Sequence, residues 1–187
     1  MLIAQITDTH IKLPGKLAYK KVDTAAMLRR CVEELLKQQP QPDLILLTGD
    51  LVDLGRPEEY AHLKSILAPL KQRIIAIPGN HDERNAMRDA FAAGGYLPRT
   101  GKFLQFAIDD EYPLRILGLD TLIPGQGGGE LCTERLDWLD AALRRKPDMP
   151  TLVLMHHPPF ITGIGHMDKI GLKGRDEFTA IVARHPQ

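Results

Sequence analysis

Four short aliphatic runs, none of which contains a charged residue, constrain the fold of this chain more than any other feature. Runs of this kind are typical of strands that are buried on both faces of a sheet. They comprise residues 2–7, 44–48, 74–77 and 152–155. Amphipathic helices are predicted at 23–37, from 57 onwards, at 83–92, from 133 onwards and at 175–183. This alternation of strands and helices predicts a mainly parallel inner sheet with right-handed crossovers.

Two further apolar runs predict a β-hairpin. Residues 103–108 and 114–119 are joined by a turn-like acidic segment that ends in proline. Together with run 152–155, this hairpin is expected to form a second sheet packed on the first. The expected fold class is therefore α/β with a layered architecture. No repeat or interdomain linker interrupts the pattern, so residues 1–187 are expected to form a single domain.

Composition narrows the possible partners. The 24 Lys and Arg residues balance 24 Asp and Glu residues, so the chain has no global attraction for nucleic acid or acidic membrane. An anionic substrate must instead be held by local charge or by metal.

The two cysteines lie far apart, which excludes a disulfide framework and a zinc ribbon. No apolar run approaches the ~20 residues that cross a bilayer, and the N-terminus lacks signal-peptide character. We expect a soluble, cytoplasmic domain.

Polar side chains follow each of the four buried runs. These residues are Asp8, His10, Asp50, Asp53, Asn80, His81 and His156. A lone Asp at a strand end is commonly a cap or turn residue, and a lone His is commonly structural. However, ligands of open α/β sheets bind beyond the carboxyl ends of the strands. Four strand ends that carry the same donor chemistry therefore predict a metal site.

The donor types indicate which metals would bind. Carboxylates, an amide and imidazoles without thiolate suit Mn, Fe, Co or Zn better than Ca or a structural zinc site. The carboxylate of Asp50 has enough lone pairs to bridge two ions. Two such ions can clamp a phosphoryl group and lower the pKa of a shared water. The predicted cofactors are thus two divalent or trivalent transition-metal ions.

These residues resemble the calcineurin-like metallophosphoesterase superfamily, whose pattern reads D-x-H, G-D, G-N-H-D/E, H and G-H-x-H. Residues 49–60 and 156–159 are similar to class III cyclic-nucleotide and glycerophosphodiester phosphodiesterases. The resemblance implies an α-β-β-α sandwich. It also implies the ligands: Asp8 and His10 for one ion, Asn80 and His156 for the other, and Asp50 as the bridge. His81 would contact the phosphate and assist the leaving group, and the Asp53 carboxylate would orient His81.

The function implied by the resemblance is hydrolysis of cyclic nucleotides or small phosphodiesters, such as 3',5'-cAMP or glycerophosphodiesters, through metal-activated hydroxide. One alternative is a metal-dependent phosphomonoesterase, including a protein phosphatase. Another is a scaffold that retains the fold without catalysis. A nuclease is disfavoured because aromatic residues make up only 5% of the chain and no basic stripe accompanies them.

The final G-H-x-H of the family pattern is absent, since the sequence ends Arg-His-Pro-Gln. We therefore expect a C-terminally truncated domain with partial metal occupancy and open strand edges, which could associate as a homo-oligomer. His185 is expected to stay outside the site, whereas His157 and Asp82 are expected to steer ligands. Asp120 is expected to be structural. The basic loop from Lys12 to Lys21 and the glycine-rich segment 125–130 are expected to be a solvated loop and a flexible loop.

Overall fold

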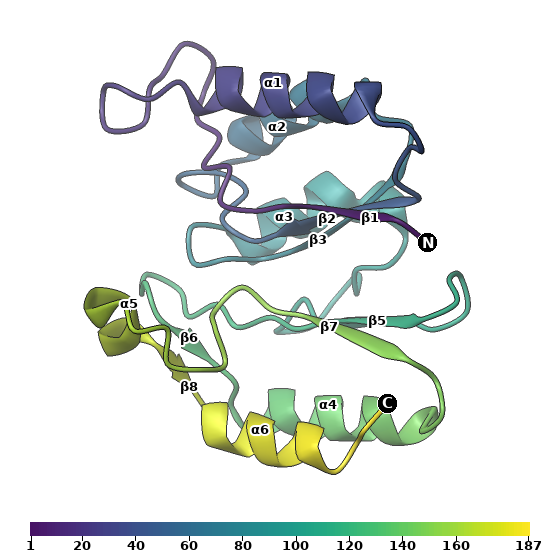
Figure 1. The fold of residues 1–187 in the computed structure, drawn as a ribbon. Helices are drawn as coiled ribbons and strands as arrows, with labels where there is room; N and C mark the ends of the chain where they lie inside the picture. The colour runs from purple at the N-terminus through teal and green to yellow at the C-terminus, as the bar shows by residue number, and fades with distance from the viewer.

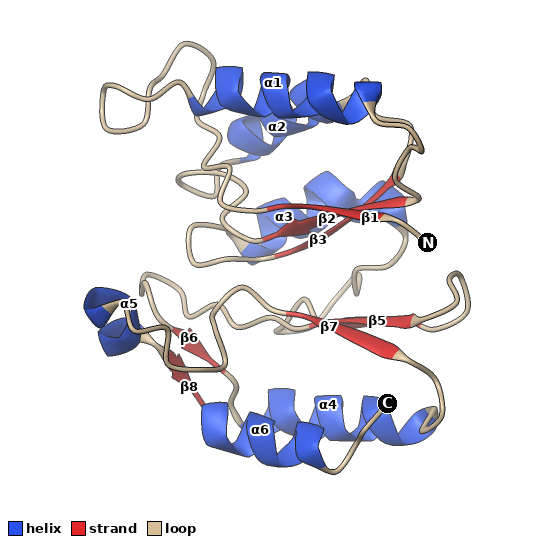
Figure 2. Ribbon diagram, in the orientation of Figure 1, coloured by secondary structure: helices blue, strands red, loops and turns tan.

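The computed structural model describes residues 1–187, and its first sheet consists of three parallel strands (Figures 1 and 2). These strands are β1 (Ile3–Ile6), β2 (Leu44–Thr48) and β3 (Arg73–Ile77), in that order across the sheet. In the register, Leu44 lies between Ile3 and Arg73. The predicted parallel inner sheet is confirmed.

The second sheet contains β4 (Phe106–Ile108), β5 (Arg115–Gly118) and β7 (Thr151–Leu154). Strands β4 and β5 pair antiparallel, as predicted for a hairpin, and β7 pairs parallel with β5. The two sheets lie face to face in Figure 1. Strands β1 and β7 each have only one neighbouring strand.

Helices cover the outer faces of both sheets. The first sheet is covered by α1 (Thr24–Lys37), α2 (Pro57–Leu67) and α3 (Arg84–Phe91), and the short 3-10 helix η1 (Ala92–Gly94) follows α3. The second sheet is covered by α4 (Thr133–Arg145) and α6 (Arg175–Ala183) (Figure 1). Their ends follow local chemistry: the Asp23 side chain accepts from the N–H of Ala26, and α2 begins at a proline. The result is the expected α-β-β-α order.

Two hydrophobic clusters hold these layers together. The larger one joins helices α1–α3 to the first sheet and extends to Phe106, Ile116 and Leu154 of the second sheet. The smaller one packs Leu139 of α4 and Phe178 of α6 beneath β5. Because residues of both sheets share the larger cluster, burial of apolar surface fixes the two sheets against each other.

Three short elements were not predicted: α5 (Gly165–Ile170) and the parallel pair β6 (Gly129–Glu130) and β8 (Leu172–Lys173). The expectation of a flexible loop over 125–130 is therefore wrong at the end of that segment. A Cβ on Gly128 would lie 2.3 Å from the carbonyl oxygen of Ile170, so glycine serves close backbone approach here. None of the helices has both the length and the apolar character needed to cross a membrane.

Candidate metal centre

Side chains from both sheets meet at the carboxyl ends of the strands. Asp8, Asp50 and Asn80 follow β1, β2 and β3, and His156 follows β7. These four residues line one cavity of about 460 Å³. The loop ends after β1, β2 and β3 lie together at the left of Figure 1, beside the segment that follows β7.

Asp50 is the most central of the candidate ligands. Its Oδ1 lies 3.5 Å from His156 Nε2, and its Oδ2 lies 3.7 Å from His10 Nε2. Nε2 of His10 is also 3.9 Å from Asp8 Oδ1. Asp50 thus stands between two sets of donors, as the bridging role requires, and it is 4% exposed.

The backbone is strained at three candidate ligands. Asp8, His10 and Asp50 have φ values of 54°, 40° and 50°, in the left-handed region that non-glycine residues seldom adopt. Such a conformation costs about 1–3 kcal/mol per residue and persists only where surrounding contacts enforce it. Here the N–H of Asp8 donates to the carbonyl of Gly49, and the N–H of His10 donates to the carbonyl of Asp50.

Two glycines allow the loops to approach closely. A Cβ on Gly79 would lie 2.2 Å from Asp50 Oδ1, and a Cβ on Gly49 would lie 2.4 Å from His156 Nδ1. Any side chain at either position would displace a candidate ligand. The glycines that directly precede Asp50 and Asn80 in the sequence therefore have a steric reason.

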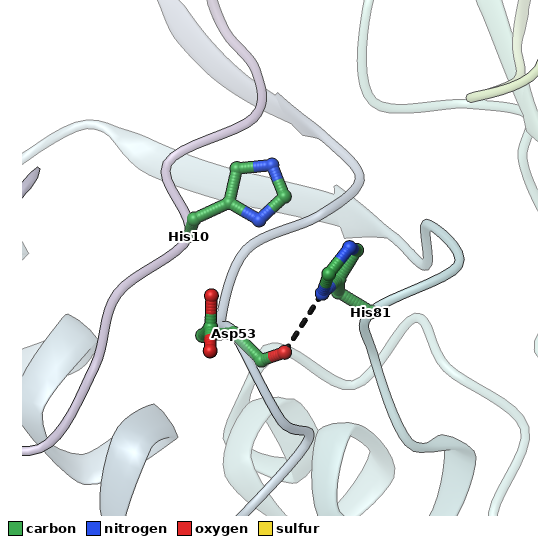
Figure 3. A group of neighbouring side chains, drawn as sticks. All are labelled: His10, Asp53 and His81. Atoms are coloured by element: carbon green, nitrogen blue, oxygen red, sulfur yellow. Dashed lines mark hydrogen bonds between the residues drawn. The ribbon is translucent and has the colours of Figure 1, made fainter. Parts of the chain in front are cut away.

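Backbone carbonyl groups orient two imidazoles. His156 donates from Nδ1 to the carbonyl of Thr48 at 2.9 Å, and His81 donates from Nδ1 to the carbonyl of Asp53 at 2.7 Å (Figure 3). These acceptors assign the ring proton to Nδ1 in both residues. Nε2 of each ring is thereby left for a ligand, a metal or a substrate.

Asp50 and His156 stabilise each other's charged form. Burial alone would raise the pKa of Asp50, but contact with His156 and the N–H of His81 outweighs it and lowers the pKa. Burial likewise opposes the charged form of His156, yet the neighbouring Asp50 carboxylate raises the pKa of His156. A negative charge on Asp50 is therefore well supported at neutral pH.

A second group of donor atoms surrounds His10. Atoms of His10, Asp53 and His81 lie within 4.8 Å of one another (Figure 3). The structure replaces the expected contact between the Asp53 carboxylate and His81 by the carbonyl contact, because that carboxylate pairs with Lys12. Lys12 thus departs from the expected solvated loop, whereas Lys16, Lys20 and Lys21 are exposed as expected. The other group of donor atoms within 4.8 Å of one another consists of Asp8, Asp50 and His156, and His10 Nε2 lies 3.9 Å from Asp8 and 3.7 Å from Asp50.

The buried carboxylate of Asp82 connects the loops that follow β2 and β3 by hydrogen bonds. Its Oδ2 accepts from the N–H groups of Leu51 and Gly79 at 3.2 and 2.9 Å, and its Oδ1 accepts from the hydroxyl of Tyr60 at 2.7 Å. Burial raises the pKa of Asp82 to about 6 despite these donors. The expected steering role thus acts through the backbone of two loops. The hydrogen bond from the Tyr60 hydroxyl is a contact that the helical pattern of the sequence did not reveal.

The other polar residues considered in the sequence, His185, Asp120 and His157, have different environments in the structure. His185 contacts Asp140 of α4 through Nε2 at 2.9 Å and does not join the donor groups. Asp120 accepts two hydrogen bonds from Arg84, which confirms its structural role. His157 lines the cavity, where its Nδ1 lies 2.7 Å from the hydroxyl of a threonine and its Nε2 has no partner.

The donors present fit a transition-metal centre. The cavity combines two carboxylates, one amide and the nearly buried imidazole of His156, whose Nε2 lies 3.5 Å from Asp50 Oδ1. This mixed oxygen and nitrogen set suits Mn, Fe, Co or Zn. The strained backbone at Asp8 and Asp50 indicates that the arrangement of these two carboxylates is enforced rather than incidental.

Comparison with known proteins yields one family. Residues 1–182 match the profile described as calcineurin-like phosphoesterase. The chain is 39% identical to the probable glycerophosphodiester phosphodiesterase GpdQ of Arcobacter nitrofigilis, over 100% of this chain and 68% of the relative. It is 34% identical to GpdQ of Enterobacter lignolyticus, over 100% and 67%. It is 33% identical to the 3',5'-cyclic adenosine monophosphate phosphodiesterase CpdA of Pseudomonas aeruginosa, over 100% and 66%. The chain therefore spans about two thirds of the length of these relatives.

Replacement of Gly79 by alanine tests the close approach of the loops. Because the added Cβ would overlap Asp50 Oδ1, Gly79→Ala should weaken Mn²⁺ binding by about tenfold or more, measured by titration calorimetry. Gly165→Ala is the matched control, since nothing lies within 4 Å of its Cβ. Equal Mn²⁺ affinity in both variants would contradict this steric account.

His157 should make the metal-free protein acid-sensitive. Burial, followed by the charge of His156, lowers the pKa of His157 to about 4, so the unfolded chain binds the proton first. The contribution of neutral His157 to the free energy of unfolding is fully present above about pH 6.5 and is lost as the pH falls towards 4. Relative to His157→Gln, the free energy of unfolding should fall by about 2–3 kcal/mol between pH 7 and 4.5 in urea titrations. The raised pKa of Asp82 changes the free energy of unfolding with pH in the opposite direction, but this change is the same in both proteins and cancels in the difference. A difference that does not vary with pH would exclude a buried neutral His157.

Proposed function

The chain belongs to the calcineurin-like phosphoesterase family, and from this premise we propose that it hydrolyses small phosphodiesters at a binuclear metal centre. The observation that carries the proposal is the position of Asp50 between His10 and His156, with its two oxygens directed to different donors. A carboxylate in this position can join two cations. The phosphodiesterase names of the relatives support a diester over a monoester.

We assign the ligands in two overlapping sets. Asp8 and His10 would hold one ion, Asn80 and His156 would hold the other, and Asp50 would contribute an oxygen to each. Fe, Mn, Zn or Co at these positions would supply Lewis acidity to the phosphoryl oxygens and lower the pKa of a water molecule. The formal net charge of the chain is zero, so attraction of the phosphate depends on this local charge.

His81 is the proposed proton donor. Its ring packs edge-to-face on His10 with centroids 4.7 Å apart, and its Nδ1 is held by the Asp53 carbonyl. Nε2 is the remaining nitrogen, and the side chain is exposed to an entering substrate. As the water oxygen bonds to phosphorus and releases a proton to solvent, the ester P–O bond breaks and His81 would give a proton from Nε2 to the leaving alkoxide. An open diester gives a phosphomonoester and an alcohol, and a cyclic diester gives one phosphomonoester that carries the new hydroxyl group.

Small diesters are the proposed substrates, with 3',5'-cAMP and glycerophosphodiesters as the two types that the relatives' names suggest. Two open cavities of about 460 and 510 Å³ share Asn80 and provide room for two small ester arms. A phosphomonoesterase is the second candidate function, because the same donors can clamp a monoester.

Hydrolysis of bis(p-nitrophenyl) phosphate, compared with p-nitrophenyl phosphate, tests the proposal. The protein is stripped with EDTA and reloaded with Mn²⁺. Diester hydrolysis should be abolished by EDTA, return with Mn²⁺ and exceed monoester hydrolysis. Faster monoester hydrolysis would favour the phosphomonoesterase. Loss of both activities in metal-saturated protein would favour a scaffold without catalysis.

A pair of variants separates metal binding from proton donation. Asp50→Ala should abolish the second metal equivalent, since no neighbouring carboxylate can replace the bridge. His81→Ala should retain the metal and lower the rate for an alkyl leaving group by roughly 10²–10⁴-fold. Elemental analysis after gel filtration gives the metal content of each protein. Equal metal loss in both variants would identify His81 as a ligand.

A further inference from the structure

An exposed apolar segment lies next to the candidate metal centre. Between residues 160 and 170, five large apolar side chains remain accessible to solvent and belong to neither hydrophobic cluster. They are Phe160, Ile161, Ile164, Met167 and Ile170. Exposure of so much apolar surface in one short segment is unfavourable in water and is commonly associated with binding.

This segment is held in place by specific contacts. The carboxylate of Asp168 accepts from the N–H and the hydroxyl of Thr162 and from the N–H of Gly163. At the other end of α5, the N–H of Gly129 donates to the carbonyl of Gly171, where β6 pairs with β8. Of the five apolar side chains, Met167 and Ile170 are therefore presented by an anchored helix, α5, which lies at the left of Figure 1.

Two of the five apolar side chains face the donors. Met167 and Ile170 line the same cavity of about 460 Å³ as Asp8, Asp50 and His156. Their exposed fractions are 36% and 53%, so both retain surface for a ligand to cover. We call this pair the apolar wall of the metal cavity.

The cavity on the other side of Asn80 has a different character. It measures about 510 Å³ and includes His81, and its lining is rich in charged and amide side chains. Its only large apolar side chains are Leu54 and Leu122. Asn80 thus lies between one cavity with an apolar wall and one polar cavity.

We propose that Met167 and Ile170 select diesters whose retained arm, the ester arm that stays on phosphorus, is apolar or aromatic. The leaving alcohol then occupies the polar cavity, where His81 protonates it. An aromatic arm on the apolar wall removes the exposed surface of Met167 and Ile170 from water, which a small or polar arm does not do. This inference rests on the proposed diester hydrolysis but makes an independent statement about which arm is preferred.

A matched substrate pair tests the apolar wall. Methyl p-nitrophenyl phosphate and phenyl p-nitrophenyl phosphate share one leaving group and differ only in the retained arm. With Mn²⁺-loaded protein, the phenyl ester should have a KM about tenfold below that of the methyl ester. Ile170→Ser and Met167→Ser should each raise the KM of the phenyl ester about three- to tenfold. In both variants the KM of the methyl ester, whose retained arm covers little of this apolar surface, should rise less than the KM of the phenyl ester.

Ile161→Ser is the matched control, because Ile161 is exposed in the same segment and does not line the cavity. It should leave both KM values unchanged. Equal KM values for the two esters in wild type, or equal effects of Ile170→Ser on both, would overturn the role of the apolar wall while leaving diester hydrolysis intact.

Titration calorimetry with diphenyl phosphate and dimethyl phosphate provides a readout that needs no turnover. Tighter binding of diphenyl phosphate that is lost in Ile170→Ser supports the apolar wall even if neither p-nitrophenyl ester is hydrolysed. In that case the proposed hydrolysis fails and the selection of apolar arms stands. Equal affinity for both phosphates would refute the selection.

Discussion

The geometry of the candidate centre depends on the buried carboxylate of Asp82. Its oxygens receive N–H groups from the loops after β2 and β3 and a hydroxyl group from α2. Loss of these hydrogen bonds would leave a carboxylate without partners in a site that is only 6% exposed. The two loops that carry Asp50 and Asn80 are therefore held together by a residue that need not contact a metal.

The centre also depends on contact between the two sheets. Asp8, Asp50 and Asn80 follow strands of the first sheet, whereas His156 follows β7 of the second. The hydrogen bond from His156 to the Thr48 carbonyl fixes this imidazole against the end of β2. Apolar packing between the sheets thus supplies the rigidity that a precise set of donors requires. The same packing offsets the strain of the left-handed backbone at Asp8, His10 and Asp50.

Much of the fold follows from local patterns. The aliphatic runs identified β1, β2, β3 and β7, and the amphipathic pattern identified the helices that start near residues 23 and 57. The elements around α5 escaped prediction because β6 and β8 contain only two residues each. Pairs this short carry no hydrophobic period and form only where tertiary contacts bring their backbones together.

The donor chemistry of the candidate centre can be inferred from the order of residues along the chain. Asp, Asn and His after buried strands, with glycine before Asp50 and Asn80, already indicated a metal site at one edge of a sheet. Only the tertiary structure decided that the Asp53 carbonyl orients His81, that Lys12 neutralises the Asp53 carboxylate, and that α5 presents its apolar side chains to the cavity. These contacts join residues distant in the chain. Their partners are set by how the loops and layers pack, and that information is absent from any local pattern.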